Sequence, residues 1–223
     1  MNIVECEQVK KTYQQGKMEV PALRGIDLVV EKGAFITLAG PSGSGKTTLL
    51  NMIGGLDRVS AGRVTLDGEP LSELKDSQLA EIRLQKIGFV FQAYNLIPVL
   101  TALENVEFVM LLQGVSGRAR RQRAEELLRE VDLGDMLQRR PPELSGGQQQ
   151  RVAVARAIAA DPRIVLADEP TANLDSSTGK DLLTLMRKMN QEKNVTFIFS
   201  THDKMVMDFA DRKVVIRDGR IGK

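Results

Sequence analysis

The stretch Gly40-Pro41-Ser42-Gly43-Ser44-Gly45-Lys46-Thr47 matches the pattern G-x-x-x-x-G-K-[ST] at every fixed position. Glycines in this pattern let backbone N–H groups curl around a phosphate, and the following helix directs its positive end at the same anion. The apolar run Phe35–Ala39 predicts a buried strand before the loop, and residues 47–56 predict a helix after it. Because a strand, the loop and a helix follow one another in this order, we expect a phosphate-binding loop here.

The last residues of this loop have distinct expected roles. Lys46 should reach the β- and γ-phosphate oxygens of a nucleotide, and the Thr47 hydroxyl should bind Mg²⁺. Thr48, the next residue on the helix, is placed to add a phosphate contact. We therefore predict that ATP and Mg²⁺ are the cofactors.

A second glycine-rich segment, Leu144-Ser145-Gly146-Gly147-Gln148, lies far downstream. Ser145 is placed as a helix N-cap, and Gln148 at the third helical position completes a capping box. The two glycines leave the first helical turn without side chains, so its free N–H groups can approach an anion closely. Two anion cradles in one chain are odd for a monomeric ATPase and natural for one that shares ATP between two copies.

Two carboxylates follow the apolar strand predicted at residues 164–167. Ligands of α/β proteins bind at the carboxyl ends of the strands, where these two residues lie. Asp168 therefore suits the Mg²⁺ shell, and Glu169 suits a general base or an orienter of the attacking water. Alone, the pair could equally form a solvated turn before Pro170; beside a phosphate loop, the binding role is favoured.

Two further polar residues end predicted strands at the same sheet edge. His202, the single histidine, follows the strand at residues 195–200 and could donate to the γ-phosphate. Gln92 follows the strand at residues 88–91, and its amide could bind Mg²⁺ or the attacking water. A structural histidine and an ordinary surface glutamine are the alternatives.

Alternating strands and helices predict an α/β fold with a largely parallel sheet. Residues 3–13 and 26–30 read as strands separated by a turn at residues 15–17, and residues 93–160 turn helical. Core strands lie on both sides of that helical stretch, which indicates an insertion into one domain. We expect one domain over residues 1–223, with an ATP-binding core at about 1–92 and 161–223 and a helical subdomain at about 93–160. Further strands are expected at residues 62–66 and 213–217, and further helices at residues 77–84, 118–131 and around 182–189.

Composition narrows the function classes. The net charge of +2 is too small to indicate nucleic-acid binding. Cys6 is the only cysteine, which excludes an internal disulfide and suits a reducing compartment. No apolar run approaches the ~20 residues that span a membrane, and no signal-peptide pattern is present. We expect a cytosolic chain that reaches a membrane only through a partner.

Together these motifs resemble the ATPase domains of ABC transporters, and the resemblance covers essentially the whole chain. In chain order, they correspond to the phosphate loop (40–47), Q-loop (Gln92), signature (144–148), Walker B (Asp168, Glu169), D-loop (Leu174, Asp175) and H-loop (His202). Tyr13 lies where the family places an aromatic residue that stacks on adenine. The resemblance implies a P-loop NTPase core with ABC-type N-terminal antiparallel strands and an inserted α-helical subdomain.

The resemblance also implies a head-to-tail dimer. In this family Ser145, Gly146 and Gly147 of one subunit close over the γ-phosphate that Lys46 of the other subunit holds, and Asp175 lies at the seam. Binding of Mg-ATP closes the dimer and hydrolysis reopens it, which drives a membrane permease.

A narrower resemblance is to the macrolide-exporter and lipoprotein-release group. It is based on residues 54–57, 95–98 and 101–106. In that group the permease has few membrane helices and a large extracytoplasmic domain. Because this chain ends at Lys223, just past the core, we expect a separate permease, with a periplasmic adaptor as one option. The chain would then work at the cytoplasmic face of the inner membrane.

Two alternatives stay open at this point. Division-type relatives regulate a cell-wall enzyme through their permease, and the sequence does not separate that role from export. Soluble ABC ATPases that act on DNA or ribosomes carry a long coiled coil or two ATPase domains, and this sequence shows neither an extended heptad run nor a second domain. A neighbouring permease gene would discriminate between these functions.

Overall fold

Two β-sheets organise the protein, whose structure, a computed structural model, describes residues 1–222. Lys223 lies outside the described residues. The four-stranded antiparallel sheet has the order β2-β1-β4-β5 and the six-stranded sheet has the order β10-β9-β3-β8-β7-β6. The strands are β1 (Asn2–Gln15), β2 (Met18–Glu31), β3 (Phe35–Ala39), β4 (Ala61–Leu66), β5 (Glu69–Pro70), β6 (Ile87–Val90), β7 (Ile164–Asp168), β8 (Thr196–Thr201), β9 (Arg212–Arg217) and β10 (Arg220–Ile221).

The larger sheet is parallel except at one edge. β3 pairs in parallel with β8 and β9, and β6 pairs in parallel with β7, whereas β10 runs antiparallel to β9. This confirms the predicted α/β class with a largely parallel sheet. Because β3 runs in the same direction as its neighbours, the loop after it emerges at the carboxyl ends of the parallel strands. The ends of β8 and, beyond it, β7 lie at the same edge of the sheet.

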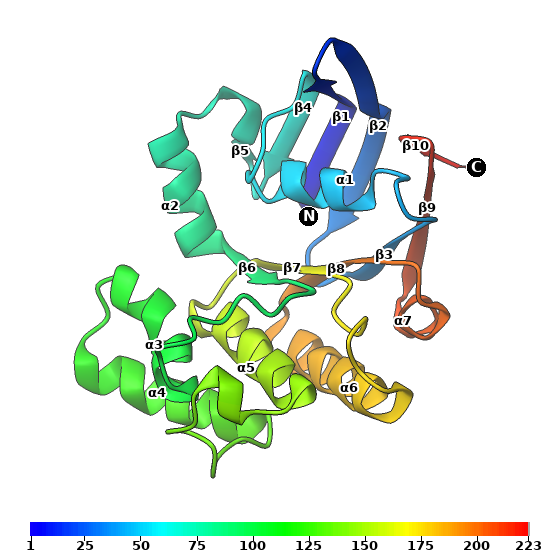
Figure 1. Cartoon of the computed structure of the whole chain (residues 1–223). Helices are drawn as coiled ribbons and strands as arrows, with labels where there is room; N and C mark the ends of the chain where they lie inside the picture. The colour runs from blue at the N-terminus through cyan, green and yellow to red at the C-terminus, as the bar shows by residue number, and fades with distance from the viewer. Residues whose placement is uncertain (223) are drawn as a thin grey trace.

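Helices cover the central sheet on both faces (Figure 1). The antiparallel sheet and α1 lie on one side, and α3, α4, α5 and α6 lie on the other. The helices are α1 (Lys46–Ile53), α2 (Asp76–Lys86), α3 (Ala102–Leu112), α4 (Gly117–Glu130), α5 (Gly146–Ala159), α6 (Ser176–Lys193) and α7 (Lys204–Phe209), with 3₁₀ turns at Leu71–Glu73 and Pro141–Glu143.

Two hydrophobic cores result from strand alternation. Successive side chains of a strand point to opposite faces of its sheet. In β8, Phe197 and Phe199 therefore join the core under the helical layer, while Ile198 joins the core under the antiparallel sheet. A strand buried on both faces reads as a continuous apolar run, as β8 does.

The helical stretch begins later than the sequence suggested. We expected helix from about residue 93, but α3 starts at Ala102 and residues 93–101 are irregular. Tyr94 and Asn95 have φ angles of 60° and 50°, a left-handed conformation that no right-handed helix accommodates, and Pro98 follows. Thr101 then caps α3 by accepting from the Glu104 backbone N–H. Within residues 1–222, no helix combines the length and apolar character that crossing a membrane requires.

Candidate nucleotide-binding and hydrolysis site

The phosphate loop connects β3 to α1 and needs two of its glycines for identifiable reasons. A β-carbon on Gly40 would lie 2.1 Å from the Ile216 carbonyl oxygen of the neighbouring strand β9. Gly45, the residue before α1, has φ of 104°, which L side chains rarely adopt. The loop is also braced from outside, because the Gly219 N–H in the β9–β10 turn donates to the Ser44 carbonyl at 3.0 Å.

Lys46 is held across this loop. Its ammonium Nζ donates to the carbonyls of Gly40 at 2.8 Å and Pro41 at 3.0 Å, and the residue is buried. A buried ammonium with only two neutral acceptors has a third N–H and a full charge to offer an anion. The side chain therefore points into the cradle that the sequence assigned to a nucleotide phosphate.

A cavity of about 490 Å³ opens over the loop and collects most of the predicted site residues. It is lined by Ala22, Pro41, Ser42, Gly43, Gly45, Lys46, Thr47, Thr48, Gln92, Asp168, Glu169 and His202. Segments from five parts of the chain thus meet at one sheet edge. Ala22, in β2, was not predicted from sequence, since nothing in its local pattern marks it.

The donor set in the cavity fits a magnesium ion. The Thr47 hydroxyl donates to Asp168 Oδ1 at 3.0 Å, which places a hydroxyl and a carboxylate oxygen side by side. The Gln92 side chain lines the same cavity. Mg²⁺ prefers oxygen ligands and is usually bound through one or two carboxylates plus substrate phosphates. These residues could therefore hold it only together with a phosphate.

Glu169 is fixed by its backbone and by two neighbours. Its φ of 45° is left-handed, a strained state that persists when the surroundings enforce it, and its N–H donates to the Ser200 carbonyl at 2.9 Å. Glu169 Oε2 accepts from the Thr201 hydroxyl at 3.1 Å, and Oε1 lies 2.7 Å from His202 Nδ1. The carboxylate is thus oriented within the cavity at the end of β7.

The contact with Glu169 constrains what His202 can do. If Nδ1 donates its proton to the carboxylate, a neutral ring has only an acceptor left at Nε2. The ring can then donate to a phosphate through Nε2 only when both nitrogens are protonated. The His202 side chain is 68% exposed, so this second nitrogen is accessible.

The second cradle forms as predicted but lies apart from this cavity. Ser145 caps α5, the Gln148 N–H donates to the Ser145 hydroxyl at 3.3 Å, and the Ser145 N–H donates to Gln148 Oε1 at 2.9 Å. The predicted capping box is therefore present. Neither residue lines the phosphate-loop cavity, and neither do Gly146 and Gly147.

Both signature glycines are tightly covered within the same chain. A β-carbon on Gly146 would lie 2.8 Å from the Tyr94 hydroxyl oxygen, and one on Gly147 would lie 2.7 Å from the Thr178 methyl carbon. Real β-carbons essentially never come so close to another atom. These glycines were expected to leave room for an approaching anion, and each also leaves room for a side chain of its own chain.

Asp175 is tied to the same region. Its carboxylate caps α6 by accepting from the N–H groups of Ser177 at 3.0 Å and Thr178 at 3.1 Å, and from the Thr178 hydroxyl at 2.6 Å. The Thr178 hydroxyl, above all, holds the pKa of Asp175 well below its usual range. Through Thr178, the predicted D-loop residue is therefore linked to Gly147.

The segment after Gln92 is held by side chains that were not predicted from the sequence. Arg156 of α5 donates to the carbonyls of Tyr94 at 2.9 Å and Asn95 at 2.6 Å. Asn173 donates to the carbonyl of Gln92 at 2.9 Å. These contacts fix the two left-handed residues, and they span more than sixty positions of sequence, so no local pattern reveals them.

Tyr13 lies near, but outside, the cavity lining. Its hydroxyl donates to Asp57 Oδ2 at 3.0 Å, and the residue stays 38% exposed. Tyr13, which the resemblance assigned to adenine, therefore lies on a separate wall formed by β1 and the segment after α1. Asp57 had been noted only as part of a subgroup motif.

Comparison with known proteins agrees with this geometry. Residues 23–172 match the family model described as ABC transporter. The lipoprotein-releasing system ATP-binding protein LolD of Anaeromyxobacter dehalogenans is 50% identical over 98% of this chain and 92% of its own length. The macrolide export ATP-binding/permease protein MacB of Syntrophobacter fumaroxidans is 48% identical over 99% of this chain, which spans 31% of MacB.

Solved structures show the same architecture. The dimeric, post-hydrolysis structure of MJ0796 bound to ADP and Pi, a protein of Methanocaldococcus jannaschii, superposes with a TM-score of 0.93 at 45% identity and covers 99% of this chain and 97% of that one. The chain belongs to the ABC transporter family of ATP-binding proteins. Within it, the protein is an ATP hydrolase of the type found in MacB and LolD.

Proposed function

We propose that two copies of this chain share two ATP molecules head to tail and that their closing and opening drive a separate permease. The observation that carries the proposal is the separation of the two anion cradles. The first surrounds Lys46, and the second, at Ser145, lines no part of the same cavity. A second copy, turned end to end, would bring its Ser145 over this chain's Lys46.

In this proposal each site residue has a chemical task. Backbone N–H groups of residues 40–47 and the Lys46 ammonium bind the phosphates. Thr47, Asp168 and Gln92 supply oxygen ligands to Mg²⁺, which neutralises phosphate charge when bound. Glu169 takes a proton from the attacking water, and His202, when both ring nitrogens carry protons, donates to the γ-phosphate through Nε2. Tyr13 stacks on the base, and Asp175 links the two sites at the seam.

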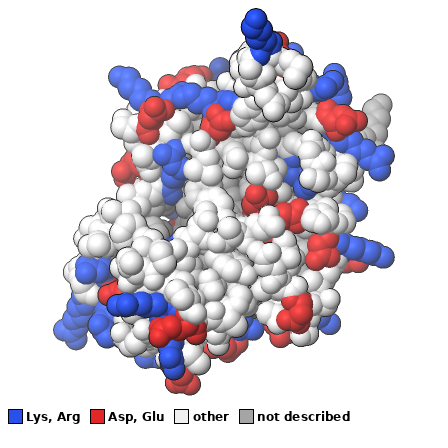
Figure 2. All heavy atoms as spheres, viewed as in Figure 1, with Lys and Arg blue, Asp and Glu red and all other residues white. Residues whose placement is uncertain are grey.

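We further propose that residues of about 93–160 form a subdomain that transmits dimer closure to the permease. An apolar groove of about 450 Å³ supports this, since it lies where β6 meets the irregular segment, α3 and α5. Phe91, directly before Gln92, lines it together with Phe108 and Leu112. The surface between α2 and α3 is largely uncharged (Figure 2). An apolar segment of the permease would fit such a groove.

Matched leucines test the permease contact. Leu112 lines the groove and is 58% exposed, whereas Leu111 is 49% exposed and does not line it. With the neighbouring permease co-expressed, Leu112→Glu should abolish co-purification while the isolated protein keeps its ATPase rate. Leu111→Glu should leave both unchanged. Equal retention of the permease by both variants would rule out this groove as the contact.

Mixed subunits test the sharing of ATP. A dimer of one Lys46→Ala and one Ser145→Ala subunit keeps one intact site if the cradles are shared, and none if they are not. A dimer of wild-type and Lys46→Ala/Ser145→Ala subunits shows the reverse. Nucleotide occupancy and ATPase of the two mixtures therefore give opposite results. Activity confined to the second mixture would contradict sharing.

The proposed permease also determines where in the cell the protein should work and which proteins should bind it. We propose that the protein works at the cytoplasmic face of the inner membrane, bound there through the permease, with a periplasmic adaptor as an added partner. Co-purification from solubilised membranes, followed by identification of the bound proteins, tests both partners. Recovery of the ATPase without any membrane protein would contradict the assignment.

A further inference from the structure

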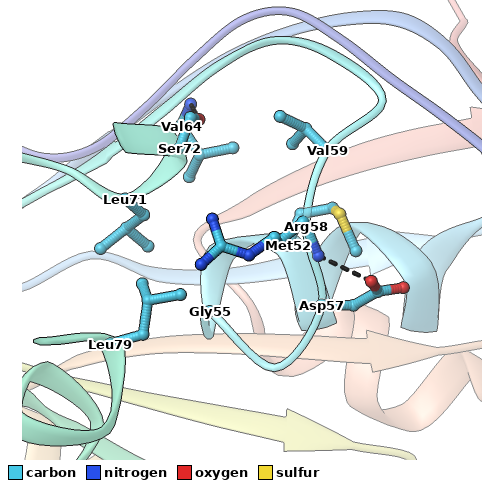
Figure 3. Close-up of a pocket in the computed structure, with 9 residues that line it drawn as sticks. All are labelled: Met52, Gly55, Asp57, Arg58, Val59, Val64, Leu71, Ser72 and Leu79. Carbon is cyan, nitrogen blue, oxygen red and sulfur yellow. Dashed lines mark hydrogen bonds between the residues drawn. The ribbon is translucent and has the colours of Figure 1, made fainter. Parts of the chain in front are cut away.

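The Asp57 carboxylate accepts three hydrogen bonds although it lies outside the phosphate-loop cavity. It follows α1 by four residues and lines a small cavity of about 230 Å³. Oδ1 accepts from Lys11 Nζ at 2.7 Å and from the Arg58 N–H at 2.6 Å, and Oδ2 accepts from the Tyr13 hydroxyl at 3.0 Å. Figure 3 shows the Asp57 carboxylate and the Arg58 guanidinium pointing in opposite directions.

We propose that Asp57 is a positioning residue for nucleotide recognition: it fixes the ring of Tyr13 at a set distance from the phosphate loop. The inference rests on the proposed stacking of Tyr13 against the base. It goes beyond that role by assigning a task to a carboxylate that touches neither base nor phosphate.

The hairpin that carries Tyr13 gives the ring little support of its own. Tyr13 lies two residues before the end of β1 and pairs with Val20 of β2, which is itself 42% exposed. A side chain in such a place can adopt several rotamers, and selecting one of them costs entropy when a ligand binds. The bond to Asp57 selects the rotamer before the nucleotide arrives.

The other end of this bond is anchored to the phosphate loop through α1. The chain leaves α1 in a compact turn. In this turn the Gly54 N–H donates to the Leu50 carbonyl and the Leu56 N–H donates to the Asn51 carbonyl, both at 2.9 Å. Asp57 therefore moves with α1, whose first residue is Lys46. The proposed base contact and the phosphate contact are then held by one rigid element.

Lys11 completes the arrangement. Its ammonium lies 4.9 Å from the centre of the Tyr13 ring and also donates to the Arg58 carbonyl at 2.7 Å. It thus covers part of the ring as a cation–π neighbour, and Asp57 balances its charge. Although Lys11 contacts the Tyr13 ring and Asp57 binds its hydroxyl, Tyr13 is still exposed enough to receive one flat ligand.

Protonation states suit these bonds. Burial and the bond to Asp57 raise the pKa of Tyr13, so the phenol keeps its proton and donates. For Asp57, burial alone would raise the pKa, but the hydrogen bonds from Lys11, Arg58 and Tyr13 together lower it, so the carboxylate is ionised and accepts.

The test compares ATP with inorganic tripolyphosphate, which has the charges but lacks the base. Asp57→Ala should raise the Kd for ATP about 3- to 10-fold, the range that one hydrogen bond's net worth implies. The Kd for tripolyphosphate should stay unchanged. Tyr13→Phe should match Asp57→Ala, and the double variant should be no weaker than either single variant. Asp76→Ala is the matched control, because Asp76 bonds Arg58 and does not contact Tyr13.

A spectroscopic readout follows the Tyr13–Asp57 bond directly. The chain has no tryptophan and only two tyrosines, so Tyr94→Phe leaves Tyr13 as the single phenol. In that background, Asp57→Ala should lower the pKa of Tyr13, measured as tyrosinate absorbance during alkaline titration. Should Asp57→Ala misfold, Tyr13→Phe tests the same bond with Asp57 intact.

Three results would overturn the inference. Equal weakening of ATP and tripolyphosphate by Asp57→Ala would mean that Asp57 supports the phosphate loop itself. Unchanged ATP binding in Asp57→Ala, with weakened binding in Tyr13→Ala, would leave base stacking intact and remove the positioning role. Unchanged ATP binding in Tyr13→Ala would remove the proposed stacking and, with it, the role of Asp57.

Discussion

The Tyr94 hydroxyl occupies the space in front of Gly146 that a β-carbon would need, at 2.8 Å from the position such an atom would take. Tyr94 belongs to the segment after Gln92, and Gly146 opens the signature helix α5. In the proposed dimer, Gln92 serves this subunit's own ATP and Gly146 serves the partner's. The contact therefore joins, inside one chain, the parts that face two different nucleotides.

Gly146→Ala should push the Tyr94 hydroxyl out of its place, and removal of that hydroxyl should relieve the clash. The added methyl meets the far end of the Tyr94 side chain, which can move aside, so the cost should lie at the low end of the about 1–3 kcal/mol typical of overpacking. We expect weaker ATP-dependent dimerisation and a lower ATPase rate, with partial recovery in Gly146→Ala/Tyr94→Phe. Gly117→Ala is the control, since Gly117 also opens a helix but its nearest neighbours are at 3.7 Å. Failure of Tyr94→Phe to rescue would show that the methyl obstructs the partner instead.

Arg156→Lys should release the segment after Gln92. Arginine reaches two consecutive carbonyls with its fork, whereas a lysine ammonium lacks that geometry. These hydrogen bonds are only partly buried, so losing one should cost about 0.5–1.5 kcal/mol. Hydrogen exchange at residues 92–97 should quicken and ATP hydrolysis should slow, while ATP binding persists. Arg151→Lys, on the same helix but bonded to Val131 and Asp132, should show neither effect.

Glu169→Gln should keep ATP binding and trap a closed dimer. The amide preserves the size of the side chain but cannot take a proton from water, and general base catalysis typically contributes about 10²–10⁴-fold. Size-exclusion chromatography with ATP and single-turnover hydrolysis measure the two effects. A variant that remained monomeric with ATP and hydrolysed it at the normal rate would exclude Glu169 as the catalytic carboxylate.

Cys6 should resist alkylation in the folded protein. Burial, assisted by the charge of Asp27, raises the pKa of its thiol from 9.0 to about 12. At pH 8 iodoacetamide should therefore react only as the chain unfolds, and denaturant should accelerate the reaction. Because the thiol holds its proton more tightly when folded, this group favours the folded state fully below pH 9 and loses that contribution as pH rises toward 12. Urea unfolding of wild type and Cys6→Ala at pH 7 and pH 10 checks the sign.

Local patterns were sufficient for the parts of the site that a short segment builds alone. The residue pattern of the loop at 40–47 and the Ser145–Gln148 capping box can each be read within a few positions, so the sequence predicted them, although the brace of the loop by Gly219 could not be read there. The start of α3 was also readable, because Thr101 and Glu104 have capping-box spacing, yet the expected helical stretch began too early. The strands β5 and β10 have two residues each, too few to show periodicity.

The remaining features depend on contacts between distant segments. Arg156 reads as an ordinary helix residue until the fold places Tyr94 and Asn95 beside it. Likewise, only the pairing of β1 with the rest of the sheet brings Tyr13 to Asp57, 44 positions away. Side chains that orient other site residues were therefore missed, whereas the residues predicted to face the phosphate lie within short motifs that the sequence displays.

The bond between the Gly219 N–H and the Ser44 carbonyl has a consequence for biosynthesis. Synthesis runs from the amino end, so the phosphate loop leaves the ribosome long before the β9–β10 turn that braces it. A nascent chain that has not yet extended past residue 219 carries every predicted phosphate ligand but an unbraced loop. ATP binding should consequently mature late in translation, which limits the ability of partly made chains to hold nucleotide or pair with finished copies.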